Sequence, residues 1–369
     1  MLDLEAMNNP FGDSKVVSNC SIFGMMEMSG QPVEGGSVVE AISNMKERSN
    51  GLGAGFAVYG CYPEHQDDYA LHVMYDSEEG KELTESRLSQ TFEIVGKGEI
   101  PTEPNGTMGP APLLWRYFLV PRNGTADESA LVADEVSRIN DGIKDAFVFS
   151  AAKNMGVFKG IGYPRDLAEF YRLREYRGYI WLAHGRFPTN TMAWWGGAHP
   201  FSMLDWTVVH NGEISSYGTN RRFVETYGYR CSFLTDTEVV AYAIDLLVRV
   251  HGLPLELAAQ VLAPPLWDQI DVMDPGRAAL YRSLRSTYAG LLLNGPFSVI
   301  VAREGEMVGL TDRIRLRPLT AGIAGDRLYL SSEEAPLRLV DDDLTRVWSP
   351  QGGVPIVGRL GEGVSYDYP

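Results

Sequence analysis

The sequence predicts a mixed α+β protein in which strands from both ends of the chain share one sheet. Short runs with strand composition occur near the two ends, and segments with apolar residues at helical spacing lie between them. The chain has 369 residues, which is enough for one large domain or two ordinary ones. No repeat of fixed period and no low-complexity linker interrupts it, so we expect one main domain.

The N-terminal half alternates predicted strands with a few predicted helices. The glycine-rich stretch GLGAGF, residues 51–56, precedes a strand rather than a helix, so we interpret it as a tight turn and not as a phosphate-binding loop. Residues 96–112 are rich in Gly and Pro and predict a loop. The predicted strands are residues 21–26, 53–62, 69–76 and 113–120, and the predicted helices are residues 37–49, 128–143 and 164–176.

The C-terminal half contains the densest polar motifs. A strand in residues 178–190 runs into a loop, and residues 198–218 hold a strand followed by a turn. Residues 234–252 predict a helix with Thr235 or Asp236 as its N-cap and acidic residues in its first turn. Three further strands are predicted at residues 296–304, 306–312 and 326–333.

Composition excludes several classes of protein. The chain is 44% hydrophobic and carries a formal net charge of −16, so neither nucleic acid nor an anionic membrane face is expected as a main partner. The arginines of DRIRLRPL, residues 312–319, are too few to form a nucleic-acid stripe. No run approaches the ~18 apolar residues of a membrane helix. Residues 1–19 lack the basic start and apolar centre of a secretory signal.

The three cysteines indicate a reducing compartment. Cys20, Cys61 and Cys231 are few, odd in number and widely spaced, which argues against a disulfide scaffold and favours the cytoplasm. A thiolate metal site is not expected, because no Cys-x-x-Cys pair is present. The histidines of the polar motifs lack a carboxylate at ligand spacing, so we expect no metal there. Cys61 and Cys231 are interpreted as structural thiols.

Polar residues crowd the ends of strands in AHGRFPTN, GGAHPF and VHNGEI, where binding sites are usually built. Arg186 offers a planar fork suited to a carboxylate. Asn211 and the backbone N–H of Gly212 offer two donors that could converge on an oxyanion. Asp236, at a helix start, could take an ammonium group. Together these groups suit an α-amino acid whose carbonyl is polarised, and Cys20 is the natural nucleophile, although alone it would be interpreted as a buried thiol.

Five motifs carry a family resemblance. In order and spacing, NCSIFGMM, HGRFPTN, AHPF, VHNGEI and TDTEV resemble the class II glutamine amidotransferases, which are N-terminal-nucleophile hydrolases. The similarity runs from Cys20 to about residue 340 and includes GPFSVIVAREGEMVGLTDRIRLRPL and LYLSSEEAPL. The strings NGLGAGFAVYG, WWGGAHPF and DWTVVHNGEISSYG are similar to the stand-alone glutaminase subunit of archaeal-type glutamate synthases. In that family the FMN-bearing synthase is a separate chain.

The resemblance implies a fold and a division of the chain. The fold is a four-layer αββα sandwich of two antiparallel sheets with an α+β insertion. Residues 1–19 would be a leader that can be removed as a propeptide, residues 20–345 the amidotransferase domain, and residues 346–369 a C-terminal tail. The insertion would occupy about residues 62–178.

The resemblance also implies roles for individual residues. Cys20 would attack the side-chain amide of L-glutamine, and Asn211 with the Gly212 N–H would hold the tetrahedral oxyanion. A glutamyl thioester would form, ammonia would leave, and hydrolysis would give glutamate. The general base would be the α-amino group of Cys20, freed by removal of Met1 or of the leader, because a free α-amine titrates near pH 8.

Four residues would bind the substrate. Arg186 would hold the α-carboxylate and Asp236 the α-amino group, while Thr189 and His199 would line the pocket. His199 could instead form a loop-stabilising hydrogen bond, and His210 is expected to hold the turn of HNG. Residues 193–195, AWW, are either core or a lid or docking surface.

Two positions depart from the family pattern. Ser21 stands where Gly is usual, and Gly185 stands where Thr is common between the His and the Arg. A serine at position 21 is expected to crowd either the oxyanion region or the backbone of the nucleophile, and Gly185 to loosen the strand end that carries Arg186.

The expected partner is a separate FMN-dependent synthase, with glutamate synthase as the first choice of ammonia acceptor. No cofactor is expected on this chain, with FMN and iron–sulfur clusters only on the partner. Assembly as a homo-oligomer is left open. The alternative is a non-catalytic or unprocessed amidotransferase-like subunit with a regulatory or assembly role.

Overall fold

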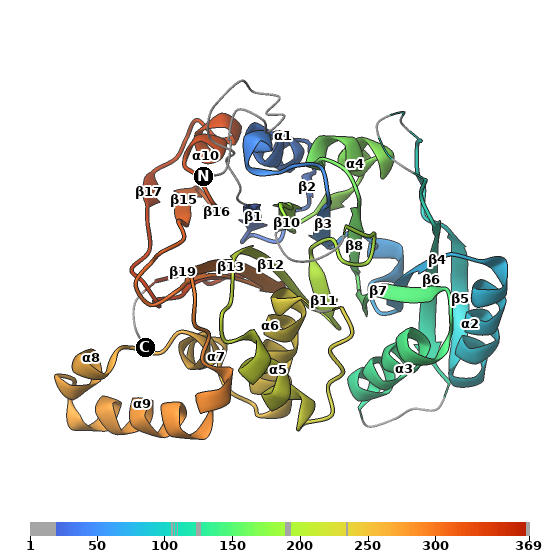
Figure 1. Ribbon diagram of the computed structural model, residues 1–369. Helices are drawn as coiled ribbons and strands as arrows, with labels where there is room; N and C mark the ends of the chain where they lie inside the picture. The colour runs from blue at the N-terminus through green and yellow to red at the C-terminus, as the bar shows by residue number, and fades with distance from the viewer. Residues whose placement is uncertain are drawn as a thin grey trace, which may run out of the picture.

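The core of the protein is a pair of antiparallel sheets packed face to face and covered by helices on both outer sides, as the computed structural model shows (Figure 1). This arrangement confirms the predicted αββα sandwich. Between its second and third layers the two sheets bury a continuous apolar core. The structure describes residues 20–104, 106, 108, 110–122, 127–188, 193–233 and 235–366.

The first sheet has seven strands and joins the two ends of the chain. β1 pairs with β10 on one side and with β16 on the other, with Ser21 opposite Gly185 and Phe23 opposite Ser331. The prediction that strands from both ends share a sheet is therefore correct. In spatial order the strands are β17 (Arg346–Trp348), β15 (Thr320–Ala324), β16 (Arg327–Ser331), β1 (Ser21–Glu27), β10 (Ile180–Gly185), β3 (Ala54–Tyr59) and β8 (Met155–Gly160).

The second sheet has six strands and carries the HNG turn at the end of β12. Gly212 pairs with Phe297 at the start of β13, and Ser298 pairs with Thr311 at the end of β14. In spatial order its strands are β11 (Phe201–Met203), β12 (Trp206–Gly212), β13 (Phe297–Arg303), β14 (Glu306–Thr311), β18 (Ile356–Arg359) and β19 (Gly363–Ser365).

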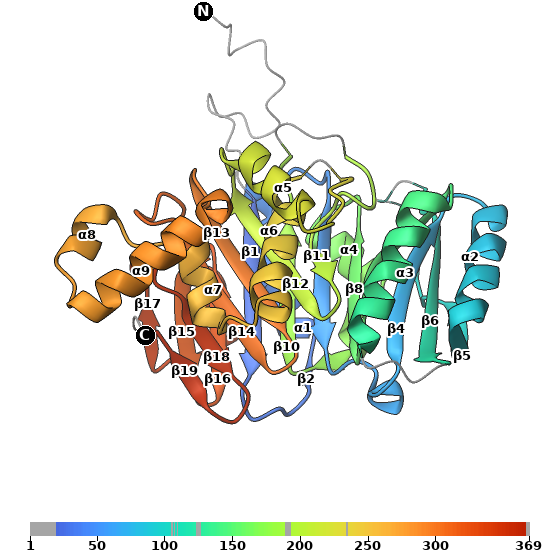
Figure 2. The same ribbon diagram turned by 90° about the horizontal axis from the view of Figure 1, so that it is seen from below.

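Two helical layers enclose the sheets (Figure 1). A two-stranded ribbon of β2 (Val33–Glu34) and β9 (Arg177–Gly178) lies beside the first sheet. α1 (Gly36–Asn44), α4 (Pro164–Phe170) and α10 (Ala335–Val340) cover the first sheet, and α5 (Tyr217–Glu225), α6 (Asp236–Asp245) and α7 (Leu255–Leu262) cover the second. α8 (Trp267–Asp271) and α9 (Pro275–Thr287) lie at one end of the molecule, opposite the insertion (Figure 2).

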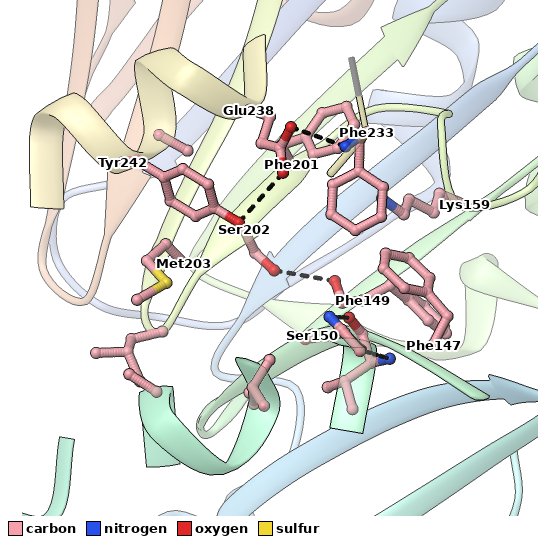
Figure 3. Close-up of a pocket in the computed structure, with 17 residues that line it drawn as sticks. Phe147, Phe149, Ser150, Lys159, Phe201, Ser202, Met203, Phe233, Glu238 and Tyr242 are labelled. Carbon is pink, nitrogen blue, oxygen red and sulfur yellow. Dashed lines mark hydrogen bonds between the residues drawn. The ribbon is translucent and has the colours of Figure 1, made fainter. Parts of the chain in front are cut away.

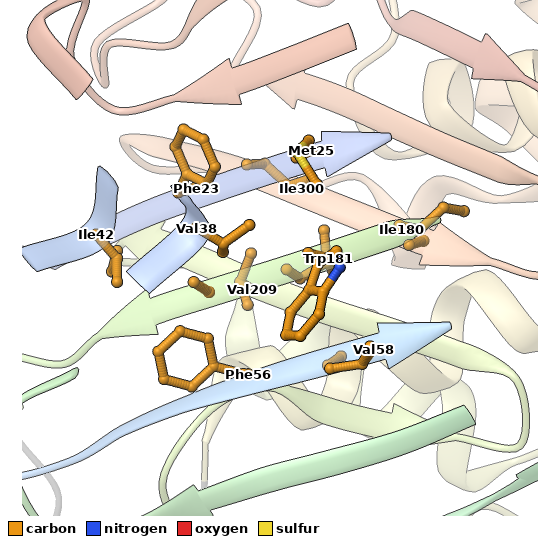
Figure 4. Packing of buried hydrophobic residues seen from close by; sticks show 14 of the residues in the cluster. Phe23, Met25, Val38, Ile42, Phe56, Val58, Ile180, Trp181, Val209 and Ile300 are labelled. Carbon is orange, nitrogen blue, oxygen red and sulfur yellow. The ribbon is translucent and has the colours of Figure 1, made fainter. Parts of the chain in front are cut away.

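Alternation of side chains along β1 fills two interfaces. Phe23 lies with Val38 and Ile42 of α1 on the helical face of the sheet (Figure 4). Gly24 faces the second sheet, where a Cβ would lie only 3.0 to 3.1 Å from Met307 and Ile300, so the two sheets approach closely at this point. Burial of each large apolar side chain contributes about 1.5–3 kcal/mol, which makes this strand a central support of the site at its end.

A third sheet forms the insertion and has its own small core, which includes Tyr75, Leu88, Tyr117 and Ile139. The expected insertion of about residues 62–178 contains this sheet, but β8 and α4 in the same range belong to the main sandwich. The strands, in spatial order, are β5 (Phe92–Glu99), β6 (Leu113–Pro121), β4 (Tyr69–Tyr75) and β7 (Ala146–Lys153), and the helices are α2 (Glu78–Thr91) and α3 (Glu128–Gly142).

Several sequence expectations about elements need correction. α2 and β5 were not predicted, because α2 buries only Gly80, Thr84 and Leu88 and so lacks a clear apolar stripe. The predicted helix over residues 164–176 ends early, since Arg172 adopts φ +53°. The expected loop over residues 96–112 begins inside β5.

The expected C-terminal tail is part of both sheets instead. β17 pairs with β15 in the first sheet, and β18 pairs with β14 in the second. Backbone groups along the outer sides of β15 and β14 find hydrogen-bond partners in this way, and the edge strands of the two sheets become β17 and β19. The segment after residue 345 therefore contributes to the fold.

Candidate active site

Cys20 and the predicted polar motifs meet where several strands of the two packed sheets begin or end. Cys20 directly precedes β1, and its neighbour Ser21 pairs with Gly185 at the end of β10. Arg186 follows Gly185 directly, so strand register alone brings the cysteine and the arginine together. In the second sheet β12 ends at Gly212, and the HNG turn, which includes residues 213–214 after this strand, leads to α5.

The Cys20 thiol is held by the backbone after β10. The N–H of Phe187 donates to Cys20 Sγ at 3.4 Å, and Arg48 Nε donates to the Cys20 carbonyl at 3.2 Å. Arg48 is fixed in turn by an ion pair of 2.7 Å with Glu333. Burial raises the pKa of the thiol above its ordinary value, although the Phe187 N–H and the positive charge of Arg186 oppose the rise. The thiol is therefore mainly protonated at neutral pH, and a nucleophilic role requires a base.

Arg186 is a buried cation beside the cysteine. Its side chain is 4% exposed, and burial lowers its pKa while Cys20 and Asp236 act in the opposite direction. Its backbone N–H donates to Gly53 O at 2.8 Å. Gly53 has φ +148°, and a Cβ there would lie 3.1 Å from Arg186 Cδ. The GLGAGF stretch is thus the predicted tight turn, and it packs against the arginine.

Asn211 and Gly212 are tied to the strand of the nucleophile through a serine. Asn211 is fully buried and donates from Nδ2 to Ser332 Oγ at 3.2 Å. The same Ser332 Oγ accepts the Ile22 N–H at 3.1 Å. Gly212 has φ +148°, and a Cβ would lie 2.0 Å from Pro296 O, so only glycine fits there. These contacts fix the pair of predicted oxyanion donors relative to Cys20.

Asp236 lies in the first turn of α6 and reaches back to the HNG turn. Its Oδ2 accepts the Ile214 N–H at 3.0 Å, and its Oδ1 lies 3.4 Å from His210 Nδ1. Burial raises the pKa of Asp236, but His210 and the hydrogen bonds from Ile214 and Thr237 outweigh burial, so its pKa lies below the ordinary value. Thr235 occupies the N-cap without a side-chain hydrogen bond, and Asp236 is not the N-cap. The carboxylate is thus ionised and partly exposed.

His199 belongs to a buried imidazole pair. His199 Nδ1 lies 3.1 Å from His184 Nε2, which also donates to the carbonyl of His210 at 2.9 Å. Burial lowers the pKa of His184 to about 3 and holds the pKa of His199 well below its ordinary value, so both rings are neutral. His199 interacts electrostatically with Arg186, which places it near the site. Thr189 lies outside the described residues.

The two departures from the family pattern compensate for each other. Ser21 is fully buried, and its Oγ lies 3.5 Å from the carbonyl oxygen of Gly185. A Cβ on Gly185 would lie 2.6 Å from Ser21 Oγ. The serine hydroxyl therefore occupies the space that a side chain at position 185 would need. The strand end that carries Arg186 is packed by Ser21 instead of by its own side chain.

A separate small cavity lies where the insertion meets α6, and none of the predicted site residues lines it (Figure 3). Lys159 and Glu238 are buried in its wall, and burial brings the pKa of each to about 7. Lys159 Nζ donates to Gly196 O at 2.9 Å and to Pro200 O at 3.4 Å, so it clamps the loop that carries His199.

The two tryptophans of residues 193–195 lie in different environments, one partly exposed and one in the core. Trp194 is 39% exposed and packs against Phe147 and Phe233, whereas Trp195 is 9% exposed and packs against Phe170 in the main core.

Sequence reasoning missed four contributors to the site. Ser332 and Arg48 act through backbone and amide contacts, and Phe187 acts through its backbone N–H, so none shows a chemical signature in the sequence. Arg317 interacts electrostatically with Cys20, and its only signal was the arginine-rich stretch after β14. In the described part of the chain, no group of three or more His, Cys, Asp and Glu side chains could hold a metal ion.

Comparisons with known proteins identify the family and relatives of this chain. Residues 129–353 match the family described as class-II glutamine amidotransferases. An uncharacterized protein of Archaeoglobus fulgidus is 53% identical over 349 residues, which are 92% of each chain. A provisionally named glutamine amidotransferase of Methanothermobacter thermautotrophicus is 24% identical over 327 residues, covering 88% of this chain and 94% of that protein.

A solved structure shares the fold. The glutamine phosphoribosylpyrophosphate amidotransferase of B. subtilis, complexed with ADP and GMP, superposes with a TM-score of 0.50 at 15% identity. The superposition covers 95% of this chain and 49% of that structure, so this chain spans about half of its length. None of the helices in the described part of the chain combines the length and the hydropathy that a membrane-spanning helix needs.

Proposed function

The chain belongs to the class II glutamine amidotransferases, and from this premise we propose that it hydrolyses L-glutamine to glutamate and ammonia through Cys20. One observation carries the proposal. Cys20 and Arg186 lie together where β1 begins and β10 ends, and both interact electrostatically with Asp236. This set offers a nucleophile, a cation and an anion, which match the amide, the α-carboxylate and the α-ammonium group of glutamine.

The proposed reaction has two halves. Arg186 and Asp236 bind the two charged ends of the substrate, and the thiol sulfur of Cys20 attacks the side-chain carbonyl carbon. Asn211 Nδ2 and the Gly212 N–H stabilise the resulting oxyanion. The intermediate expels its nitrogen with a proton as ammonia and leaves a glutamyl thioester. Water then attacks the thioester carbon, which releases glutamate and restores the thiol.

The base in this scheme is the α-amino group of Cys20. The raised pKa of the thiol means that a proton must be removed before attack. Among the described residues, no imidazole or carboxylate forms a hydrogen bond with Sγ, whose partners are the backbone carbonyl and N–H of Phe187. An α-amine with a pKa near 8 can accept the proton, whereas a peptide nitrogen cannot. We therefore propose that the bond between Asn19 and Cys20 is cut.

The ammonia is proposed to pass to a separate FMN-dependent synthase, with glutamate synthase as the acceptor. The similarity of three sequence strings to stand-alone glutaminase subunits supports this choice. FMN and iron–sulfur clusters would then belong to the partner, and the reaction would take place in the cytoplasm.

The test is glutamine hydrolysis by the purified chain, together with the mass of its native N-terminus. We expect a chain that starts at Cys20, releases ammonia and glutamate, and loses this activity in Cys20→Ala. Cys231→Ala is the matched control, because Cys231 is a buried thiol whose pKa is raised to about 12 by burial. Normal turnover by Cys20→Ala would overturn the proposal. An inactive chain that starts at Met1 would favour the non-catalytic regulatory alternative.

A further inference from the structure

A short basic loop lies on the rim of the candidate active site. We define the basic loop as Arg313–Leu316, which follows β14. Gly212 pairs with Phe297, and the next residue, Ser298, pairs with Thr311. The last residue of β14 therefore lies at the same end of the sheet as the HNG turn. The residue after the basic loop, Arg317, interacts electrostatically with Cys20. Ammonia that leaves Cys20 at this edge would emerge close to the basic loop.

The surface of the basic loop combines exposed apolar side chains with positively charged arginines. Ile314 is 63% exposed and Leu316 is 58% exposed. Arg313 donates to Asn294 Oδ1 at 2.8 Å and Arg315 to Pro350 O at 3.3 Å, both neutral acceptors. Within the described ranges neither guanidinium has an ion pair with a carboxylate. Two arginines that lack such an ion pair stand out on a chain whose net charge is −16.

The positive and apolar surface continues beyond the loop onto α8 and α9. Arg285 of α9 interacts electrostatically with Arg313. The Arg285 guanidinium lies 3.7 Å from the ring centroid of Trp267, a residue that is 52% exposed. Arginine and tryptophan are among the residues enriched at the energetic centres of protein interfaces.

The loop is rigid because a buried carboxylate fixes its backbone. Asp312 is 4% exposed, and its two oxygens accept the backbone N–H groups of Phe297, Ile314, Leu316 and Arg317 at 2.8 to 3.3 Å. Arg315 adopts φ +54°, an unusual conformation for a residue with a side chain. A loop held in one conformation loses little entropy on docking.

We propose that the basic loop docks an acidic face of the subunit that accepts the ammonia. The inference rests on the proposed function, since it assumes that ammonia is made at Cys20 and used elsewhere. Ile314 and Leu316 supply the apolar centre of the interface, and Arg313 and Arg315 supply charge complementarity to the partner. The location brings the acceptor to the edge of the site where ammonia is released.

The first test places a photo-crosslinker on the loop. Leu316 is replaced by p-benzoylphenylalanine in the tagged full-length chain, which is then irradiated in its source cells. Leu339 of α10 is the matched control site, because it is 55% exposed but lies on the outer helical layer. We expect the Leu316 probe, and not the Leu339 probe, to crosslink to an acidic segment of a flavin-containing synthase.

The second test reverses the charge of the loop. Arg313→Glu/Arg315→Glu should lower the association rate constant with the synthase captured in the first test by about tenfold at low salt, because charge steering raises association rates. Arg122→Glu is the control, since Arg122 is exposed like Arg315 and, like Arg315, donates to a backbone carbonyl, in its case that of Ser89. Glutamine hydrolysis by the isolated double variant should remain unchanged.

The outcomes separate the two proposals. Crosslinking of the Leu316 probe to a second copy of this chain, to another class of protein, or to nothing overturns the docking proposal, as does equal crosslinking from both probes. An unchanged association rate in the double variant overturns it as well. Glutamine hydrolysis that depends on Cys20 would still support the proposed function in each of these cases, and its absence would refute that function independently.

Discussion

Ser21 and Gly185 should behave as one coupled unit in the stability of the protein. The two residues face each other across β1 and β10. A Cβ on Gly185 would lie 2.6 Å from Ser21 Oγ and 3.2 Å from atoms of Pro164 and Ser49. Gly185→Ala must therefore displace the buried serine, and overpacking of this kind costs about 2 kcal/mol.

Removal of the hydroxyl should relieve most of this strain. Ser21→Gly alone should cost about 0.5–1 kcal/mol, because a glycine in a strand loses backbone entropy on folding. In Ser21→Gly/Gly185→Ala only the contacts of 3.2 Å remain, and shifts of a few tenths of an ångström can absorb them. The double variant should accordingly be about 1–2 kcal/mol more stable than the sum of the single effects predicts.

The assay is equilibrium urea unfolding of the wild type, both single variants and the double variant, followed by tryptophan fluorescence. The control cycle combines Gly185→Ala with Ser331→Gly, because Ser331 is also fully buried in the same sheet but does not contact the Gly185 position. That cycle should be additive within about 0.5 kcal/mol. Additivity of the Ser21 and Gly185 changes would refute the claim that the two departures compensate.

Asn211→Ala should lower kcat for glutamine hydrolysis about 10²–10³-fold with little change in KM, as expected for loss of an oxyanion donor. An equal loss of kcat in Ser332→Ala, measured in the same steady-state assay, would argue against direct contact between Asn211 and the oxyanion. The Asp236 pKa is lowered in the folded state, so its stabilising effect is complete above the unfolded value of about 3.9 and is lost as pH falls through the folded value. Asp236→Asn should therefore be less stable than the wild type at pH 7 and converge with it in acid, and a constant difference in urea midpoints from pH 7 to pH 3 would contradict this. Burial lowers the pKa of Lys159 to about 7 in the folded protein. Above pH 7 the unfolded chain therefore binds more protons at this lysine than the folded chain does. The free energy of unfolding should rise with pH as a result, by up to ~1.4 kcal/mol per pH unit. Lys159→Met should remove that slope in unfolding measurements between pH 7 and 9, and an unchanged slope would refute the assignment.

Local sequence patterns predicted the strands that carry the site. The apolar runs of β1, β10, β12 and β13 were recognisable because strand-forming side chains recur there between polar turns. The turn at GLGAGF was also predictable, since glycine is needed where the backbone has positive φ. Such signals report on the conformation and burial of neighbouring residues in the chain, and they are readable without any tertiary contact.

Elements without such a local signal were missed. α2 exposes most of its surface and has no apolar stripe, and the strands after residue 345 were interpreted as a tail. β17 and β18 are strands because the edges of β15 and β14 offer them backbone hydrogen bonds. Their stability comes from pairing partners that are distant in sequence, and no window of local sequence contains that information.

The chemical groups of the site can be identified from the sequence: a cysteine, an arginine, an Asn-Gly pair and an aspartate occur in an order that resembles one family. The folded arrangement, in contrast, places Cys20 Sγ against the backbone of Phe187, 167 positions later, and joins Asn211 to β1 through Ser332. It also decided that Ser21 fills the space beside Gly185. The physical reason is strand register: a shift of one residue would turn each side chain to the opposite face, and the register is fixed by packing between sheets rather than by any one strand.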